Sequence, residues 1–151
     1  MNYLPIFFVA AAVSMGQVLV ATAALDVLTG LLFAWMGPLA TNVYNSTLTL
    51  YWAAFLYHIP LGDETAMLAT SMPVLMNYAH ARHLDPLALG MVWTFGAGAK
   101  IFVYQSAPMV VGYSYGAFDA RAMLKIGACL TVVESLLLLL LVPFYWPLIG
   151  I

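Results

Sequence analysis

The chain has 151 residues, of which 65% are hydrophobic and only 7% are Asp, Glu, Lys or Arg, whereas roughly a quarter of the residues of a soluble domain are charged. Its net charge is −2 and it has no cluster of Lys or Arg, which argues against nucleic acid as a partner. Long apolar runs predict an all-α integral membrane protein in contact with the lipid bilayer. We expect it to cross the plasma or inner membrane several times.

Two helices are expected first. Residues 4–24 are apolar and about as long as the ~20 residues that a helical crossing needs. They lack the positively charged start of a signal peptide, so we expect a spanning helix. Residues 25–37 are shorter and contain Asp26 and Trp35, which favours a helix lying along the membrane surface.

A helical hairpin is expected over residues 40–80, with its tip near 60–65. Each arm is marginal for a full crossing at about 1.5 Å of rise per residue. The tip, "IPLGDETAM", carries the adjacent acids Asp63 and Glu64. Because a bend in the backbone survives at membrane depth only where protein or water surrounds it, we expect a re-entrant hairpin with a wet tip.

An interrupted helix is expected over residues 86–118. Asp85 and Pro86 form a helix-start pattern, and Pro108 removes a backbone donor and disfavours helical backbone at the residue before it. Residues 120–148 then form a last spanning helix. Arg121 and Lys125 favour the cytoplasm for its beginning, and the whole chain is expected to be one membrane domain.

Four stretches carry a resemblance to a known family: "DETAMLATSMP", "LDPLALG", "YQSAPMVVGYSYGAF" and "DARAMLKIGACLTVVESLLLLLLVPFYWPLIG". In order and spacing they resemble the carboxy-terminal half of the divalent anion/sodium symporters, which carry dicarboxylates, citrate and sulfate. The resemblance implies one inverted-repeat half of a secondary transporter for a small anion, coupled to sodium or protons. Such a half is expected to form a homo-oligomer or to associate with an amino-terminal half.

The resemblance also implies where the site lies. The family has a Ser-Asn-Thr triplet at the hairpin tip and a Thr-Pro-Pro-Asn-like break in the following helix. Counting back from Pro73 aligns the triplet with Asp63, Glu64 and Thr65. Counting back from Phe118 aligns the break with Ser106, Ala107 and Pro108. The resemblance thereby implies substrate binding at Glu64, Thr65, Ser106, Ala107 and Pro108. Ion binding or coupling is expected at Asp63, Glu64, Thr65 and Ser106, and also at Lys100, because of its charge.

Glu64 departs from the asparagine of the triplet, and an uncompensated carboxylate at the bilayer centre is costly. Sodium or a proton would neutralise it, and so would Lys100, which we place in the apolar helix two turns before the break. We hypothesise a Glu64–Lys100 ion pair that replaces or modifies sodium coupling. The alternative is that Asp63 and Glu64 cap the second arm of the hairpin while Lys100 extends toward the membrane surface.

Three further features remain open. Glu134, within an apolar helix, is either a functional acid or a packed, hydrogen-bonded one. His58 is either a proton relay or a satisfied core residue, and the spacing of His80, His83 and Asp85 is a weak zinc pattern. No nucleophile, phosphate loop or cofactor motif is recognisable, so we expect no enzyme, no cofactor beyond a coupling Na⁺ or H⁺, and no other metal. A non-transporting truncated repeat, or a subunit that depends on a partner, is the alternative function.

Overall fold

The computed structural model describes residues 24–36, 42–62, 64–81 and 83–150, together with single positions between 6 and 22. Its described part is built from helices joined by turns and contains no strand, so the all-α fold class is confirmed. The helix expected over 4–24 falls mostly outside the described residues. Asp63 and Arg82 also lie outside them.

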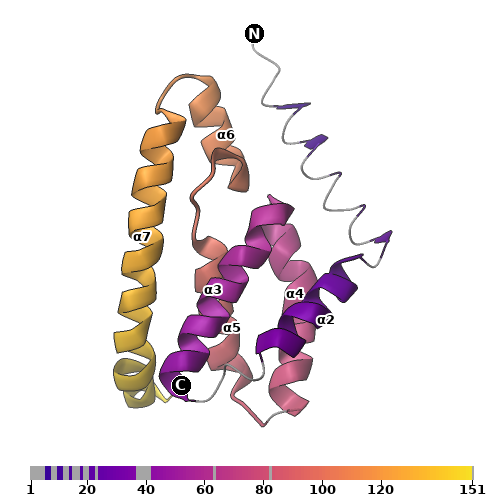
Figure 1. The fold of residues 1–151 in the computed structure, drawn as a ribbon, viewed down its shortest axis with the longest axis vertical. Coiled ribbons are helices and arrows are strands. Elements are labelled where there is room, and N and C mark those ends of the chain that lie inside the picture. Colours follow the sequence, from indigo (N-terminus) through magenta and orange to yellow (C-terminus); the bar gives the residue numbers. More distant parts are fainter. Residues whose placement is uncertain are drawn as a thin grey trace.

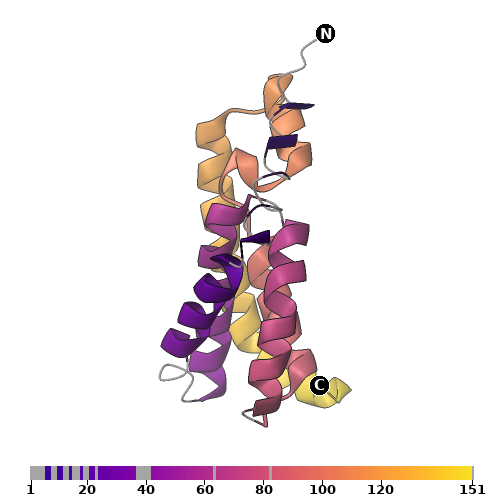
Figure 2. The same ribbon diagram turned by 90° about the vertical axis from the view of Figure 1, so that its right-hand side faces the viewer.

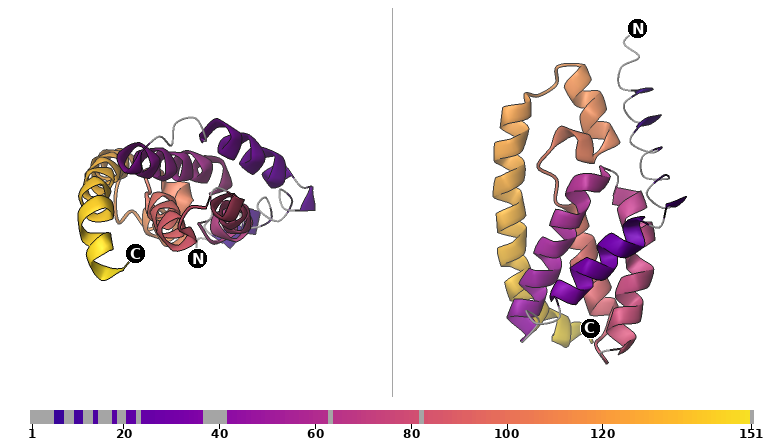
Figure 3. Two further views of the ribbon diagram at one scale, coloured as in Figure 1. Left: turned by 90° about the horizontal axis from the view of Figure 1, so that it is seen from below. Right: turned by 45° about the vertical axis from the view of Figure 1, so that its right-hand side comes forward.

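The first described helix, α2 (Ala24–Met36), occupies the place predicted for residues 25–37. It crosses the outside of the hairpin obliquely and packs mainly against α4 (Figure 3). Val27, Leu31 and Trp35, at intervals of four residues, are all more than half exposed. Side chains four apart share one face of a helix, so α2 presents an outward apolar stripe.

The hairpin consists of α3 (Val43–Leu61) and α4 (Glu64–Ala81). The side chain of Asn42 caps α3 by accepting a hydrogen bond from the amide of Asn45, at 2.9 Å. Gly62 ends α3 with a φ of 61°, the left-handed conformation that glycine adopts without a steric penalty. The chain therefore reverses over only two residues, and both arms open toward the same end of the molecule (Figure 1).

Helix α5 (Pro86–Gly98) packs against both arms of the hairpin. Gly96 permits the close approach to α3, since a Cβ at this position would lie 2.7 Å from the Cβ of Ala54. On the other side, the fully buried Trp93 donates a hydrogen bond from Nε1 to Ser71 Oγ of α4, at 2.8 Å. The core of the molecule thus lies where α3, α4 and α5 meet.

The interruption predicted within residues 86–118 is present, but its position differs from the prediction. Helix α5 ends at Gly98, the backbone is extended at Ala99 and Phe102, and one 3₁₀ turn (Val103–Gln105) precedes α6 (Ala107–Ser114). Pro108 lies in the first turn of α6, where its missing amide hydrogen costs nothing. It therefore starts the second half-helix and does not break the first. Lys100 lies in the break itself, so its expected place in a helix two turns earlier was wrong.

Helix α7 (Ala120–Leu140) begins at Asp119, whose side chain caps it, and continues through a π-helical turn (Leu141–Tyr145) and a 3₁₀ turn (Trp146–Ile149). It runs along most of the molecule, and the hairpin tip lies level with the half of α7 that is nearer its start (Figure 1). Helix α6 lies beyond that tip in two perpendicular views (Figures 1 and 2). In the described part, residues 120–149 form the one helix that is long and apolar enough to cross a membrane.

The two faces of α7 differ in residue size and polarity. Its inner face buries small or polar residues, Gly127, Thr131 and Ser135, together with Leu138. Its outer face exposes a broad apolar surface that includes Ile126, Leu130, Leu136, Leu137, Leu140 and Phe144. A helix of this kind packs closely on one side and leaves the other side for an apolar environment.

Gly127→Ala is expected to destabilise the protein by about 1–3 kcal/mol, because the new methyl group overpacks the contact between α7 and the break. A Cβ there would overlap the carbonyl oxygen of Lys100 and lie 2.9 Å from Ile101 Cα. Gly30→Ala in α2 is the matched control, since nothing lies within 4 Å of its Cβ and alanine favours the helix by about 1 kcal/mol. Thermal unfolding in detergent compares the two. A Gly127→Ala protein that melts at or above the wild-type temperature contradicts this packing.

Candidate functional site

The tip of the hairpin contacts the break between α5 and α6. Tyr104 of the break donates a hydrogen bond from its hydroxyl to the carbonyl of Ile59, at 2.9 Å. Gly62 lies against the ring of the same tyrosine, since a Cβ at this glycine would be 3.5 Å from Tyr104 Cδ2. Backbone carbonyls in the last turn of a helix have no hydrogen-bond donor within that helix. Tyr104 therefore supplies a donor for one of these carbonyls at the end of α3.

An ion pair joins the same two segments. Lys100 Nζ lies 2.6 Å from Glu64 Oε2, and it also donates to the carbonyl of Gly98 at 3.1 Å. The side chains are 19% exposed for Lys100 and 35% for Glu64, so the pair is only partly open to solvent. The predicted pairing is confirmed, and the alternative in which Lys100 extends away from the tip is wrong. Glu64 also occupies the first turn of α4, where a carboxylate is stabilised by the positive end of the helix.

Gln105 holds the break in shape. Its Oε1 accepts hydrogen bonds from the amides of Ile101 and Phe102, each at 2.8 Å, and its side chain is completely buried. Two backbone donors that the interrupted helix leaves open are thereby satisfied. Gln105 was not among the site residues predicted from the sequence. The signal was present in "YQSAP", where one amide side chain stands beside the predicted break.

Gln105→Leu is expected to cost about 1–2 kcal/mol of stability, because two partly buried amides would each lose an acceptor and water would replace part of the roughly 1–3 kcal/mol that a fully buried amide loses. Asn77→Leu, which changes an exposed amide of α4, serves as the control. Thermal unfolding measures the loss, and circular dichroism verifies that helix content is retained. If both variants melt alike, Gln105 does not organise the break.

Lys100 also lies within electrostatic reach of a second carboxylate, that of Glu134 on α7. Tyr51 of α3 donates from its hydroxyl to Glu134 Oε2 at 3.1 Å and to the carbonyl of Thr131 at 2.9 Å. We call Glu64, Lys100 and Glu134 the charge cluster. It is drawn from α4, the break and α7, and with all three groups ionised it carries one net negative charge.

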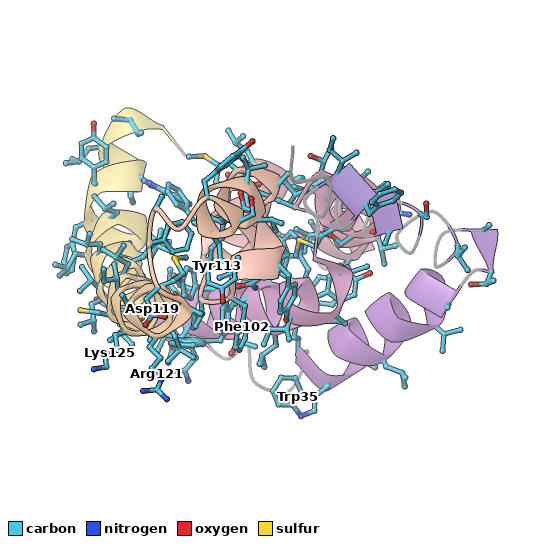
Figure 4. All side chains as sticks on the ribbon, turned by 90° about the horizontal axis from the view of Figure 1, so that it is seen from above. Trp35, Phe102, Tyr113, Asp119, Arg121 and Lys125 are labelled. Atoms are coloured by element: carbon cyan, nitrogen blue, oxygen red, sulfur yellow. The ribbon has the colours of Figure 1, made fainter. Side chains whose placement is uncertain are left out.

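The other described cations turn away from this interior. Viewed from the α6 end, Arg121 and Lys125 project outward from α7, away from Phe102 in the break (Figure 4). Both are exposed, and Asp119 beside them caps the helix. Among the described cations, Lys100 is thus the one held between helices.

The remaining predicted site residues are only partly brought to the tip. Thr65 lies in the first turn of α4 and is exposed, and Ser106 precedes α6 with its carbonyl accepting from the amides of Met109 and Val110, at 3.0 and 3.1 Å. Ala107 and Pro108 are exposed in the first turn of α6. The contacts with the tip come from Lys100 and Tyr104, earlier in the break than the motif count placed them. The roles of all these residues in binding stay predictions.

The histidines divide into one buried and two exposed side chains. His58 is completely buried in α3, one turn before the tip, and its part in proton transfer stays a prediction. His80 and His83 are exposed, and Asp85 caps α5 by accepting from the amide of Leu87 at 2.9 Å. Within the described ranges, no three His, Cys, Asp or Glu side chains lie close enough together to hold a metal ion.

Comparisons of the chain with known protein families, with characterised proteins and with solved structures returned no match. Its function is therefore inferred from its own chemistry: the tip of the hairpin, the break and the charge cluster between them. These three features lie together on the inner side of α7.

Proposed function

We propose that the chain is one repeat of a membrane transporter that binds a small anion, such as a dicarboxylate or sulfate, where the hairpin tip meets the helix break. The observation that carries this proposal is the double contact between the two interruptions, through Glu64 with Lys100 and through Ile59 with Tyr104. Secondary transporters bind substrate and coupling ion at interrupted helices near the bilayer midplane. The resemblance to divalent anion/sodium symporters is part of the same proposal.

The exposed apolar surface supports a position within the bilayer. The outer face of α7 and the stripe on α2 leave large hydrophobic side chains uncovered, which is unfavourable in water and favourable in lipid. The turns near residues 83–85 and 115–119 lie at opposite ends of the molecule (Figure 1). In this proposal α5, the break and α6 together make one crossing of the plasma or inner membrane, while the hairpin enters and leaves on one side.

The chemistry of the tip suits an anion that approaches Lys100. The first turn of α4 presents backbone N–H groups at the tip, which favour negative charge. Lys100 adds an ammonium where the related carriers are expected to hold sodium. We propose that this fixed cation substitutes for sodium at this repeat, so that anion binding here does not require Na⁺.

A partner-dependent subunit is the second candidate. The described part contains one hairpin and one broken helix, whereas transporters with inverted repeats have a matching pair of each. In that case the chain binds an anion only when a second repeat, or another copy of itself, completes the cavity. Uptake that appears only on co-expression with a second hairpin-bearing repeat would favour this candidate.

Thermal unfolding of the purified protein across sulfate, dicarboxylates and chloride tests the proposal. A ligand that binds only the folded state stabilises it by about 2.7 kcal/mol at a concentration of one hundred times Kd. We expect sulfate or a dicarboxylate to raise the melting temperature, equally in sodium and in choline buffers. If no divalent anion stabilises the protein more than chloride at equal ionic strength, the anion site is absent from the isolated chain. Uptake into vesicles then decides between transporter and subunit.

A further inference from the structure

The charge cluster has one carboxylate too many. Lys100 Nζ lies 2.6 Å from Glu64 Oε2 and donates to the carbonyl of Gly98, whereas the Glu134 carboxylate accepts from the neutral hydroxyl of Tyr51. One ammonium cannot neutralise two acids that are held between helices. Since a carboxylate without a cationic partner is unfavourable where water has only partial access, a further positive species at Glu134 would stabilise the cluster.

The surroundings of Glu134 favour a proton over a metal ion. Glu134 faces a groove of about 610 Å³ between α4 and α5. The groove is otherwise lined almost wholly by apolar groups, among them Met72, Met76, Leu87, Met91 and Phe95. The hydroxyl of Thr94, also in the lining, donates to its own helix. A hard cation needs several oxygen ligands, which this lining does not supply, whereas a proton needs only the carboxylate.

The hydrogen bonds around Glu134 suit both of its protonation states. The hydroxyl of Tyr51, which is completely buried, has one proton and two acceptors within reach, the carbonyl of Thr131 and Glu134 Oε2. When the carboxylate takes up a proton, the tyrosine hydroxyl keeps that carbonyl as its acceptor, so no buried donor is lost. The charged or titratable groups that face Glu134 are Tyr51 from α3 and Lys100 from the break. The described residues of α4 and α5 that line the groove carry none.

We propose that Glu134 binds an exchangeable proton through this groove, and that this proton removes the second negative charge of the charge cluster. The step converts a carboxylate and a proton into a carboxylic acid and changes no other bond. It takes the cluster from one net negative charge to none. An anion that approaches Lys100 then meets one negative charge fewer, so proton uptake and anion binding favour each other. This last consequence rests on the proposed function; the protonation of Glu134 does not.

Infrared difference spectroscopy of the protein in lipid vesicles, between mildly acid and mildly alkaline buffer, observes the proton directly. The wild-type protein is expected to show a carboxylic acid band that appears at acid pH and is lost in Glu134→Gln. Asp119→Asn, at the exposed cap of α7, should retain it. Tyr51→Phe keeps Glu134 and should shift the frequency of the band, because the carboxyl group loses its neighbouring hydroxyl.

Two results would overturn the inference: a band that persists unchanged in Glu134→Gln, or a band that is insensitive to Tyr51→Phe. The second variant keeps the test valid if Glu134→Gln fails to fold, because it removes one oxygen atom and leaves all charges in place. Absence of any acid band in the wild-type protein would overturn it equally.

The link to anion binding is measured separately, with sulfate, which does not titrate in this range. Sulfate is expected to bind the wild-type protein on the order of tenfold more tightly in acid buffer, a typical coupling between two sites. Glu134→Gln, which mimics the protonated state, should bind with the acid affinity at both pH values. If the infrared band behaves as expected but sulfate does not bind, Glu134 is a proton site and the proposed function fails. If sulfate binds without any acid band, the proton site fails alone.

Discussion

Lys100→Gln is expected to lower the stability of the protein by about 1–3 kcal/mol and to remove its stabilisation by divalent anions. Breaking a fully buried ion pair costs about 3–5 kcal/mol and breaking a surface pair about 0–1, and the Glu64–Lys100 pair is exposed to an intermediate degree. Loss of the ammonium leaves the carboxylates of Glu64 and Glu134 without Lys100, so an approaching anion meets their repulsion with no fixed cation to offset it. Lys125→Gln, at an exposed position on α7, should change neither property.

A double-mutant cycle separates the ion pair from other effects of the substitution. Glu64→Gln alone leaves Lys100 without its closest partner, and Glu64→Gln combined with Lys100→Gln removes both charges. The double variant should be less destabilised than the sum of the two single variants, because the second substitution relieves the charge that the first left unpaired. Strictly additive losses, or two silent single variants, would show that the pair has no energetic role.

Trp93→Ala is expected to lower the free energy of unfolding strongly, because it truncates the largest of the completely buried side chains. The indole is completely buried between α5 and the hairpin, and its ring centroid lies 6.1 Å from that of Tyr57. Truncating a buried tryptophan in a water-soluble core costs about 3–5 kcal/mol. We expect about 3 kcal/mol here, because apolar surface released into lipid or detergent loses less than surface released into water.

Trp93→Phe is the companion variant, since it keeps most of the packing and removes the hydrogen bond to Ser71 Oγ. It should cost about 0.5–1.5 kcal/mol for that bond, plus the contacts of the smaller ring. Chemical denaturation in detergent, followed by circular dichroism, compares the two. A Trp93→Ala protein as stable as Trp93→Phe would mean that α5 is not held by the hairpin in the way described.

Local signals in the sequence were sufficient to predict the hairpin and the pairing at its tip. Gly62 followed by two acids marked the reversal, and Asp85 with Pro86 marked the start of α5. The Glu64–Lys100 pair could be predicted because the chain has few Lys and Arg residues, so that few cationic partners exist for an acid within the apolar region. Each of these inferences needed only the chemistry of neighbouring residues or the cost of an isolated charge.

The exact place of the break and the third member of the charge cluster could not be predicted in this way. Proline marks the first turn of a helix as readily as an interruption, so Pro108 alone did not reveal that α5 ends at Gly98. The contact between Tyr51 and Glu134 joins residues 83 positions apart, so it depends on distances across the folded chain. Hydropathy and spacing carry no information about such contacts.

The depth of the hairpin tip in the bilayer tests the central claim most directly. Spin labels at Thr65→Cys, beside the tip, and at Asn45→Cys, in the first turn of α3, can be compared in a Cys129→Ser background, since the chain has a single cysteine. Both positions are exposed, so a label is accommodated. Relaxation by lipid-soluble oxygen and by a water-soluble reagent should place the Thr65 label deep within the membrane and the Asn45 label near its surface. Two labels at the same depth, or a tip label in bulk water, would contradict a site formed by the hairpin and the break inside the membrane.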